Sequence, residues 1–166
     1  DVSTVAGGPA GFADATGADA RFNTPEGIAV DAAGVLYVAD TQNHVIRKIT
    51  LPLGEVSTLA GTPGQRGFVD ANTNAAKFDS PHSLAVDTSG NLYVADWSNT
   101  GRIQRRDSQG NWSVIATFGP LPDNVYTPFG LALSPAGDLY VGDYGHSAVQ
   151  KRDAQGNWTV LSLGYG

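Results

Sequence analysis

Short hydrophobic runs separated by polar, glycine-containing turns follow one another along this chain. An apolar run at residues 28–30 leads through a turn at 31–34 into a second apolar run at 35–39. The turn contains Asp31, whose carboxylate can accept backbone hydrogen bonds, and Gly34, which tolerates a positive φ. This pattern predicts a strand, a tight turn and a second strand that is covered on both faces.

Two further strands are expected in the same unit. Polar residues 41–44 separate the second strand from a third at 45–49, where Arg47 and Lys48 predict greater exposure. A fourth strand is expected at 56–60. No stretch of the chain has a helical period, so the pattern predicts short antiparallel strands joined by turns.

This unit occurs three times. Each copy begins at a proline and reaches, 15 residues later, an Asp that ends a Tyr-Val-(Ala/Gly)-Asp run. The pairs are Pro25 with Asp40, Pro81 with Asp96, and Pro128 with Asp143. Constant spacing within copies and variable spacing between them is typical of repeats whose small sheets stack on their neighbours, as propeller blades do. Because every copy has this Asp, we predict that its carboxylate accepts hydrogen bonds from backbone amides in the turn to the third strand.

The units resemble NHL repeats, a β-propeller family in which a Pro-x-Gly-(Ile/Leu)-Ala-Val-Asp strand precedes a Leu-Tyr-Val-Ala-Asp strand and then an Asn-His/Asn-Arg turn. The matching positions of the first copy are Pro25, Gly27, Asp31, Gly34, Leu36, Tyr37, Val38, Asp40, Asn43, His44 and Ile46. The second copy departs at Ser83 and has one extra residue before Arg102, and the third departs at Ser134 and Gly142. The resemblance covers nearly the whole chain and implies a propeller, but a fold does not imply a function.

The predicted fold class is all-β, with the whole chain as one propeller segment. Residues 1–7 repeat the sequence of residues 55–61, which predicts one extra fourth strand before the first blade. Three blades of four antiparallel strands are expected at residues 24–60, 80–117 and 127–163. Three blades are too few to close around an axis, whereas two chains would supply six, a ring size that the NHL resemblance implies.

An open half-ring would leave apolar blade faces exposed. We therefore predict that the chain associates with itself, as a homodimer or a higher assembly. Two fourth strands would then be in excess, so one terminal strand of each chain would be displaced. The alternative is that the chain is a fragment of a longer propeller.

Composition narrows the classes of partner. The formal net charge of −6 argues against nucleic acid and against acidic membrane surfaces. The chain has no Cys, which excludes disulfides and thiolate chemistry, and no Met, which indicates a processed chain or an excised piece. No apolar run approaches transmembrane length. A cysteine-free repeat rich in Gly and Asn favours an extracytoplasmic or secreted setting.

Seven of the ten Lys and Arg residues lie on predicted third strands, where they would form a stripe around the outer body. Some NHL domains bind RNA through a basic face, so the resemblance raises this possibility. Asp107 and Asp153 interrupt the stripe, and no aromatic platform accompanies it. We therefore interpret these residues as a charged outer strand that resists edge pairing.

Three residues that follow the opening prolines are candidate site residues: Glu26, His82 and Phe129. In propellers the first strand lines the central channel, so these residues are expected near one mouth of it. Glu and His are metal ligands and acid–base groups. Some NHL-type lyases bind zinc through several channel-facing histidines, whereas this chain has one there. We predict no cofactor, with a divalent metal at Glu26 and His82 as the alternative.

The connections that follow the fourth strands are the other candidate surface. Residues 8–23 and 62–79 share Gly-Phe-x-Asp and Ala-(Arg/Lys)-Phe, and residues 119–127 form a shorter connection. Long loops on one rim of a rigid scaffold often contain the recognition residues. The predicted binding residues of this rim are Phe12, Phe68, Tyr126 and Trp97. The alternative is that the two phenylalanines pack back onto the blades as structural plugs.

These observations predict a non-enzymatic binding and assembly module that recognises a protein or a small ligand through the channel mouth and the rim loops. The first alternative is a metal-dependent propeller lyase or hydrolase with a channel site. The second is a structural protein whose copies join through exposed blade faces into a ring or a polymer.

Overall fold

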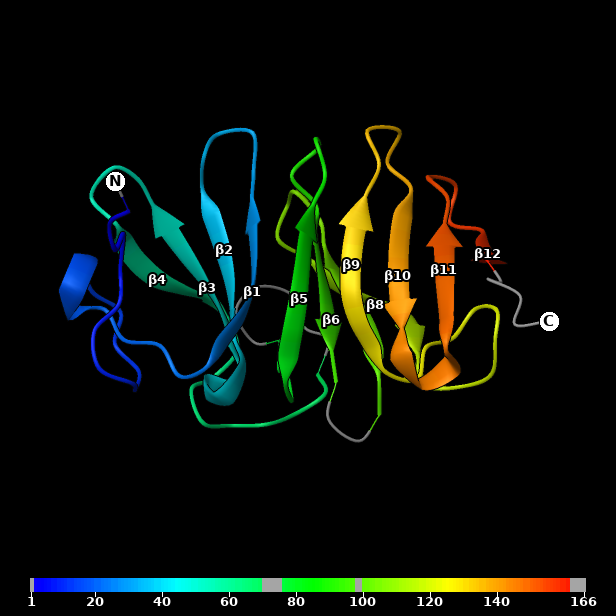
Figure 1. The fold of residues 1–166 in the computed structure, drawn as a ribbon, viewed down its shortest axis with the longest axis horizontal. Helices are drawn as coiled ribbons and strands as arrows, with labels where there is room; N and C mark the ends of the chain where they lie inside the picture. Colours follow the sequence, from blue (N-terminus) through cyan, green and yellow to red (C-terminus); the bar gives the residue numbers. More distant parts are fainter. Residues whose placement is uncertain (1, 70–75, 98–99, 162–166) are drawn as a thin grey trace.

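The computed structural model describes residues 2–69, 76–97 and 100–161 and contains three four-stranded antiparallel sheets (Figure 1). The first is β1 (Pro25–Val30), β2 (Leu36–Asp40), β3 (Val45–Thr50) and β4 (Glu55–Ala60). The second is β5 (Pro81–Val86), β6 (Leu92–Asp96), β7 (Arg102–Arg106) and β8 (Trp112–Thr117). The third is β9 (Pro128–Leu133), β10 (Leu139–Asp143), β11 (Ala148–Arg152) and β12 (Trp158–Leu161). The all-β fold with propeller blades is thereby confirmed.

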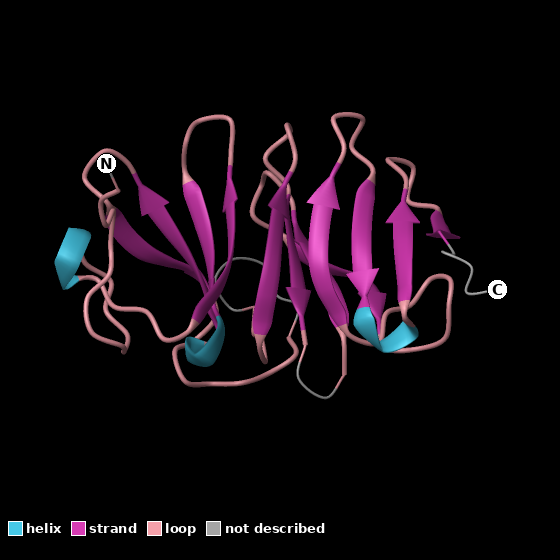
Figure 2. Cartoon of the chain, viewed as in Figure 1, coloured by secondary structure: helices cyan, strands magenta, loops and turns pink. Residues whose placement is uncertain are grey.

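Strands follow one another in space in the order of the sequence within each sheet. In the described ranges, the short 3-10 helices are η1 (Gly17–Asp19), η2 (Thr41–Asn43) and η4 (Tyr144–His146), and Figure 2 shows them outside the sheets. Among the described residues, no helix is long and apolar enough to cross a membrane.

The three blades stack face to face. The first strands β1, β5 and β9 are neighbours in the middle of the view, and β4 and β12 lie at its two ends (Figure 1). Phe78 and Trp112, whose ring centroids are 5.2 Å apart, belong to the core between the first two blades. Val125 and Leu139 belong to the core between the second and third. Each large apolar side chain that is fully buried in this way contributes about 1.5–3 kcal/mol to stability.

One repeat position sets how closely neighbouring blades approach. A Cβ at Gly27 would lie 2.3 Å from the carbonyl oxygen of His82, so β1 packs on the backbone of β5. The equivalent residue of the second blade is Ser83, whose hydroxyl accepts a hydrogen bond of 3.1 Å from the Leu131 amide of β9. The equivalent residue of the third blade is Gly130, where nothing lies within 4 Å of the Cβ position. The third blade therefore has an open contact position.

Replacing Gly27 by Ala should lower the free energy of unfolding by about 1–3 kcal/mol, because the new methyl group overlaps the β5 backbone. Replacing Gly130 by Ala is the matched control and should change it by less than about 0.5 kcal/mol. Both changes restrict the unfolded chain equally, so the difference isolates the contact. Urea denaturation of the dilute chain measures both values, and equal effects would contradict this account of blade packing.

The repeated aspartates are buried, but their hydrogen-bond partners differ from those predicted. Asp40 accepts a hydrogen bond of 2.7 Å from the Asn23 amide, and Asp143 accepts one of 2.9 Å from the Thr127 amide. These amides belong to the segment that enters the first strand, not to the turn toward the third. The reason is the register, since Pro25 pairs with Asp40 and the end of β2 thus lies beside the beginning of β1.

Arg47 is buried, which corrects the exposure predicted for it. Its guanidinium forms ion pairs with Asp40 at 2.8 Å and with Asp14 at 2.6 Å. Arg102 is also buried and pairs with Asp96 at 3.0 Å. Burial raises the pKa of the Asp96 carboxyl above its ordinary value, and the nearby Arg102 guanidinium opposes that rise. The predicted basic stripe is thus interrupted where two of its arginines are buried between their own blade and the connection that leads into it.

The extra fourth strand predicted at residues 1–7 is absent from the part of it that the structure describes, residues 2–7. A fourth strand pairs with a third strand, and β3, β7 and β11 already pair with the fourth strands of their own blades. The N-terminal segment instead packs Ala6 and Phe22 against Val38 and Ile49 of the first blade. Residues 162–163 of the third predicted blade lie outside the described residues.

Candidate functional site

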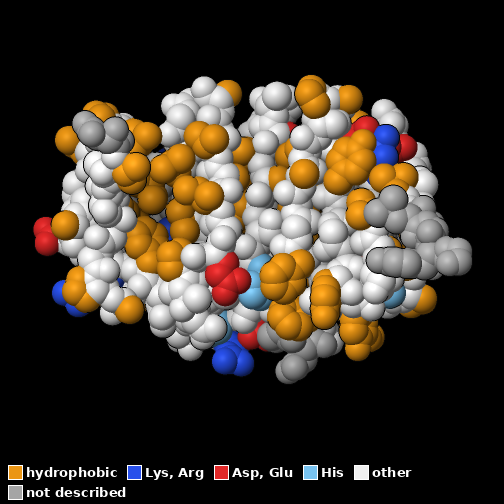
Figure 3. Space-filling model, in the orientation of Figure 1, with side chains coloured by type: hydrophobic (Ala, Val, Ile, Leu, Met, Phe, Trp, Pro, Cys, Tyr) orange, Lys and Arg blue, Asp and Glu red, His pale blue; other side chains and the backbone are white. Residues whose placement is uncertain are grey.

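Three consecutive first strands bring Glu26, His82 and Phe129 together. Nδ1 of His82 contacts Oε2 of Glu26, and the His82 ring stacks on the Phe129 ring with centroids 5.3 Å apart and planes 21° apart. Figure 3 shows a carboxylate, a histidine and apolar side chains meeting on the face formed by β1, β5 and β9. Sequence reasoning placed these residues near one channel mouth, and the structure joins them in one cluster, which we call the mouth cluster.

A β-bulge positions each member of the mouth cluster. Opposite the end of β2, Asp40 pairs with Pro25 and Ala39 pairs with Gly27, so Glu26 has no partner in the ladder. His82 and Phe129 are skipped in the same way in β5 and β9. A bulge bends its strand and redirects one side chain, and bulges are common beside binding and active sites.

Two more aromatic residues extend the mouth cluster. The Trp97 ring lies 5.6 Å from His82 and 6.2 Å from Phe129, and the Tyr144 ring lies 6.5 Å from Phe129. Each follows the repeated Asp of its blade, Trp97 after Asp96 and Tyr144 after Asp143. Sequence reasoning named Trp97 but missed Tyr144, although the shared repeat position was a signal that could have found it.

The mouth cluster combines one carboxylate with several aromatic faces. Nδ1 of His82 contacts Oε2 of Glu26, so the imidazole and the carboxylate lie side by side at the edge of the rings. The His82 side chain is largely covered by its neighbours, whereas Phe129 is 54% exposed and Tyr144 is 78% exposed. The exposed surface is therefore aromatic and lies beside a charge.

The predicted rim residues Phe12 and Phe68 lie elsewhere. The Phe12 ring covers the buried Arg47 guanidinium at 4.6 Å, and the Phe68 ring covers that of Arg102 at 4.6 Å. These are cation–π contacts, and they match the structural-plug alternative. Within the described residues, neither ring contacts an aromatic ring of the mouth cluster.

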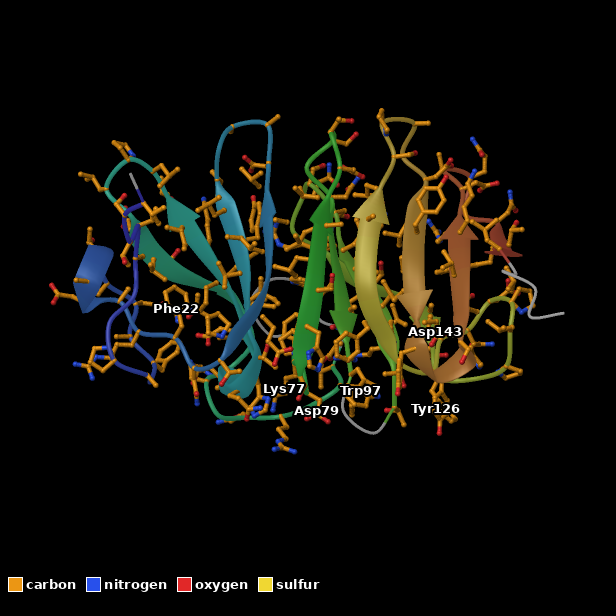
Figure 4. All side chains as sticks on the ribbon, in the orientation of Figure 1. Phe22, Lys77, Asp79, Trp97, Tyr126 and Asp143 are labelled. Atoms are coloured by element: carbon orange, nitrogen blue, oxygen red, sulfur yellow. The ribbon has the colours of Figure 1, made fainter. Side chains whose placement is uncertain are left out.

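The Tyr126 ring lies against Gly145, the residue that follows Tyr144 of the mouth cluster, but its ring contacts are with other side chains. Its ring is tilted by 42° against the Phe118 ring with centroids 4.9 Å apart, and its centroid lies 5.8 Å from that of the His146 ring. Figure 4 shows Tyr126 and Trp97 at the same lower edge of the molecule. The other two histidines are also turn residues: His146 pairs with Asp143 at 2.7 Å, and the buried His44 contacts the Asp79 carbonyl.

Within one chain, the mouth cluster offers two side chains of the kinds that bind metals. A catalytic zinc takes three protein ligands, whereas the cluster offers Glu26 and His82, which are already in contact with each other. In the described ranges, no three His, Cys, Asp or Glu side chains are arranged to hold a metal ion.

Comparison with known proteins identifies the repeats. The NHL repeat family matches residues 22–49 and 78–105. NHL repeat-containing protein 2 of Homo sapiens is 32% identical over 141 residues, which cover 79% of this chain and 18% of that protein. Protein SUPPRESSOR OF QUENCHING 1, chloroplastic, of Arabidopsis thaliana is 37% identical over 87 residues, which cover 52% of this chain and 8% of that protein. The chain thus spans less than a fifth of either relative.

The solved structures agree on the fold. Virginiamycin B lyase from Staphylococcus aureus superposes with a TM-score of 0.60 at 18% identity, over 84% of this chain and 41% of that one. At this identity the likeness concerns the fold alone. The family match, the relatives and the stacked four-stranded sheets agree, and the chain belongs to the NHL-repeat β-propeller family.

Proposed function

We propose that this chain is a non-enzymatic binding and assembly module. Its two end faces join a second copy into a six-bladed ring, and the mouth cluster recognises a partner at the centre of that ring. One observation supports assembly. The exposed face of the first blade and the exposed face of the third blade are equivalent, in the repeat, to the two faces that meet between neighbouring blades inside the chain.

The end face of the first blade exposes side chains that the other blades bury. Ile28 is 63% exposed and Val30 is 57% exposed, whereas Leu84, the counterpart of Ile28 in β5, is 6% exposed. Leu131, the counterpart in β9, packs into the core between the second and third blades. Ile28 and Val30 thus have the position and chemistry of residues that contact a preceding blade.

The loop that would lie between the first blade and a preceding blade is present in the chain, at residues 11–22. Residues 11–22 resemble residues 67–78, and the bridges Ala13–Arg21 and Val69–Lys77 are equivalent. Phe78 is buried between two blades, whereas its counterpart Phe22 is half-buried and lines a hollow of about 360 Å³ beside Ile28. The hollow is where a preceding blade would pack.

The end face of the third blade has the complementary shape. Gly130, Ala132 and Gly142 are exposed, and their counterparts in the first blade, Gly27, Ala29 and Ala39, face β5 and the core beside it. Small residues at one end and branched apolar residues at the other allow head-to-tail contact between two copies. Two such contacts close a ring of six blades.

The mass of the particle in solution tests the assembly. Light scattering across a range of concentrations should give twice the 17.2 kDa mass of the chain. Residues 2–7, which form no strand, would then lie outside the sheets of the ring. A monomer, or a series of growing particles, would contradict the closed ring and assign the end faces to further blades or to an open polymer.

A further inference from the structure

We propose that the mouth cluster binds an organic cation, an ammonium or guanidinium group, against its aromatic faces and beside the Glu26 carboxylate. This inference rests on the proposed role of the cluster as a binding site and adds the chemistry of its ligand. The cation is either a free small molecule or the side chain of a Lys or Arg on a partner protein.

The exposed rings provide the surface that a cation requires. The Phe129 and Tyr144 planes meet at 55° with centroids 6.5 Å apart, so the two faces are tilted and do not stack on each other. A cation within about 6 Å of a ring centroid is attracted by the negative π-face. Trp97, which lies 6.2 Å from Phe129 on the side of His82, adds a third ring.

The chain itself shows how its aromatic faces are used. Arg47 lies over Phe12 at 4.6 Å, Arg102 over Phe68 at 4.6 Å, and the ammonium group of Lys151 over Tyr140 at 5.9 Å. Among the described residues, no Lys or Arg covers Phe129, Tyr144 or Trp97. The mouth cluster is thus an aromatic surface of this fold that has no internal cation.

The charge of the mouth cluster favours a cation over a neutral ligand. Glu26 contacts His82 through Oε2, and its side chain is 36% exposed, so a carboxylate is accessible beside the rings. The formal net charge of −6 adds a long-range attraction for cations. Quaternary ammonium ligands are recognised elsewhere by this combination of aromatic rings and nearby negative charge.

Titration with tetramethylammonium chloride, followed by tryptophan fluorescence against a matched sodium chloride control, tests the proposal. We expect saturable binding at millimolar concentrations. Phe129→Leu and Glu26→Gln should each weaken it about tenfold, because one removes a π-face and the other removes the charge. Phe118→Leu, which replaces an exposed ring outside the cluster, should leave it unchanged.

Two further ligands complete the test. A neutral isostere, 3,3-dimethylbutanol, should bind at least tenfold more weakly than choline, and equal binding would overturn the cation proposal. N-acetyl-arginine methylamide distinguishes the sources: tighter binding than choline assigns the site to a protein side chain, and weaker binding assigns it to a free ammonium compound. Failure of all these cations to bind would also overturn it. Light scattering on the same samples shows whether the ring itself persists, so this failure is separable from failure of the assembly.

Discussion

Alanine in place of Asp40 is expected to lower the free energy of unfolding by about 3–5 kcal/mol, because it removes one partner of a buried ion pair. The carboxylate accepts from the Asn23 amide, from the Asn43 side chain at 2.8 Å and from the Arg47 guanidinium at 2.8 Å. Without it, the buried Arg47 charge keeps only Asp14 as its carboxylate partner, the Asn23 amide loses its acceptor, and the Asn43 side chain keeps only the Gly11 carbonyl.

Asp123→Ala is the matched control, since Asp123 is exposed in the connection before β9 and its loss should change stability by less than about 0.5 kcal/mol. Urea denaturation followed by circular dichroism measures both variants. A loss below about 1 kcal/mol for Asp40→Ala would show that the repeated Asp does not hold the entry of the first strand.

If two chains form the proposed six-bladed ring, replacing Ile28 by Asp is expected to convert it into single chains of 17.2 kDa. Each ring has two copies of the contact, and each would lose a buried branched side chain and acquire a carboxylate without a partner. Two losses of this size raise the dissociation constant by at least about 1,000-fold. Light scattering of the variant across the same concentration range measures this change.

The stability of the single chain separates this effect from misfolding. Ile28 is largely exposed in one chain, so Ile28→Asp should leave the urea midpoint of the dilute protein nearly unchanged. Leu53→Asp, in the exposed turn between β3 and β4, should leave the mass of the ring unchanged. A particle of unaltered mass for Ile28→Asp would exclude the end face of the first blade from assembly.

The mouth cluster shows where sequence reasoning was sufficient and where it was not. Identical positions after three prolines correctly placed Glu26, His82 and Phe129 in register, because repeats place equivalent residues at equivalent points. The bulge that turns each of them out of the ladder could not be derived, since it depends on the pairing of Asp40 with Pro25 across two strands.

For the rim loops, the sequence did not reveal the contacts that the aromatic residues make. Gly-Phe motifs in long connections predicted exposed recognition residues; Phe12 and Phe68 are 38% and 47% exposed, and each covers a buried arginine with one face. Arg47 was expected on the surface because an isolated charged residue on an outer strand is usually solvated. Its burial requires partners from residues far away in the sequence, Asp14 and the Ala13 carbonyl among them, and only the folded chain brings these together.

The sequence by itself determined the strands of the three repeated units, their antiparallel order and the number of blades, because these follow from local turn chemistry and from a unit repeated three times. The tertiary structure alone decided which charges are buried, which rings face solvent and which blade faces remain uncovered. Those properties depend on contacts between distant residues: Gly27 and Gly130 have the same repeat position, yet one lies against the β5 backbone and the other is open.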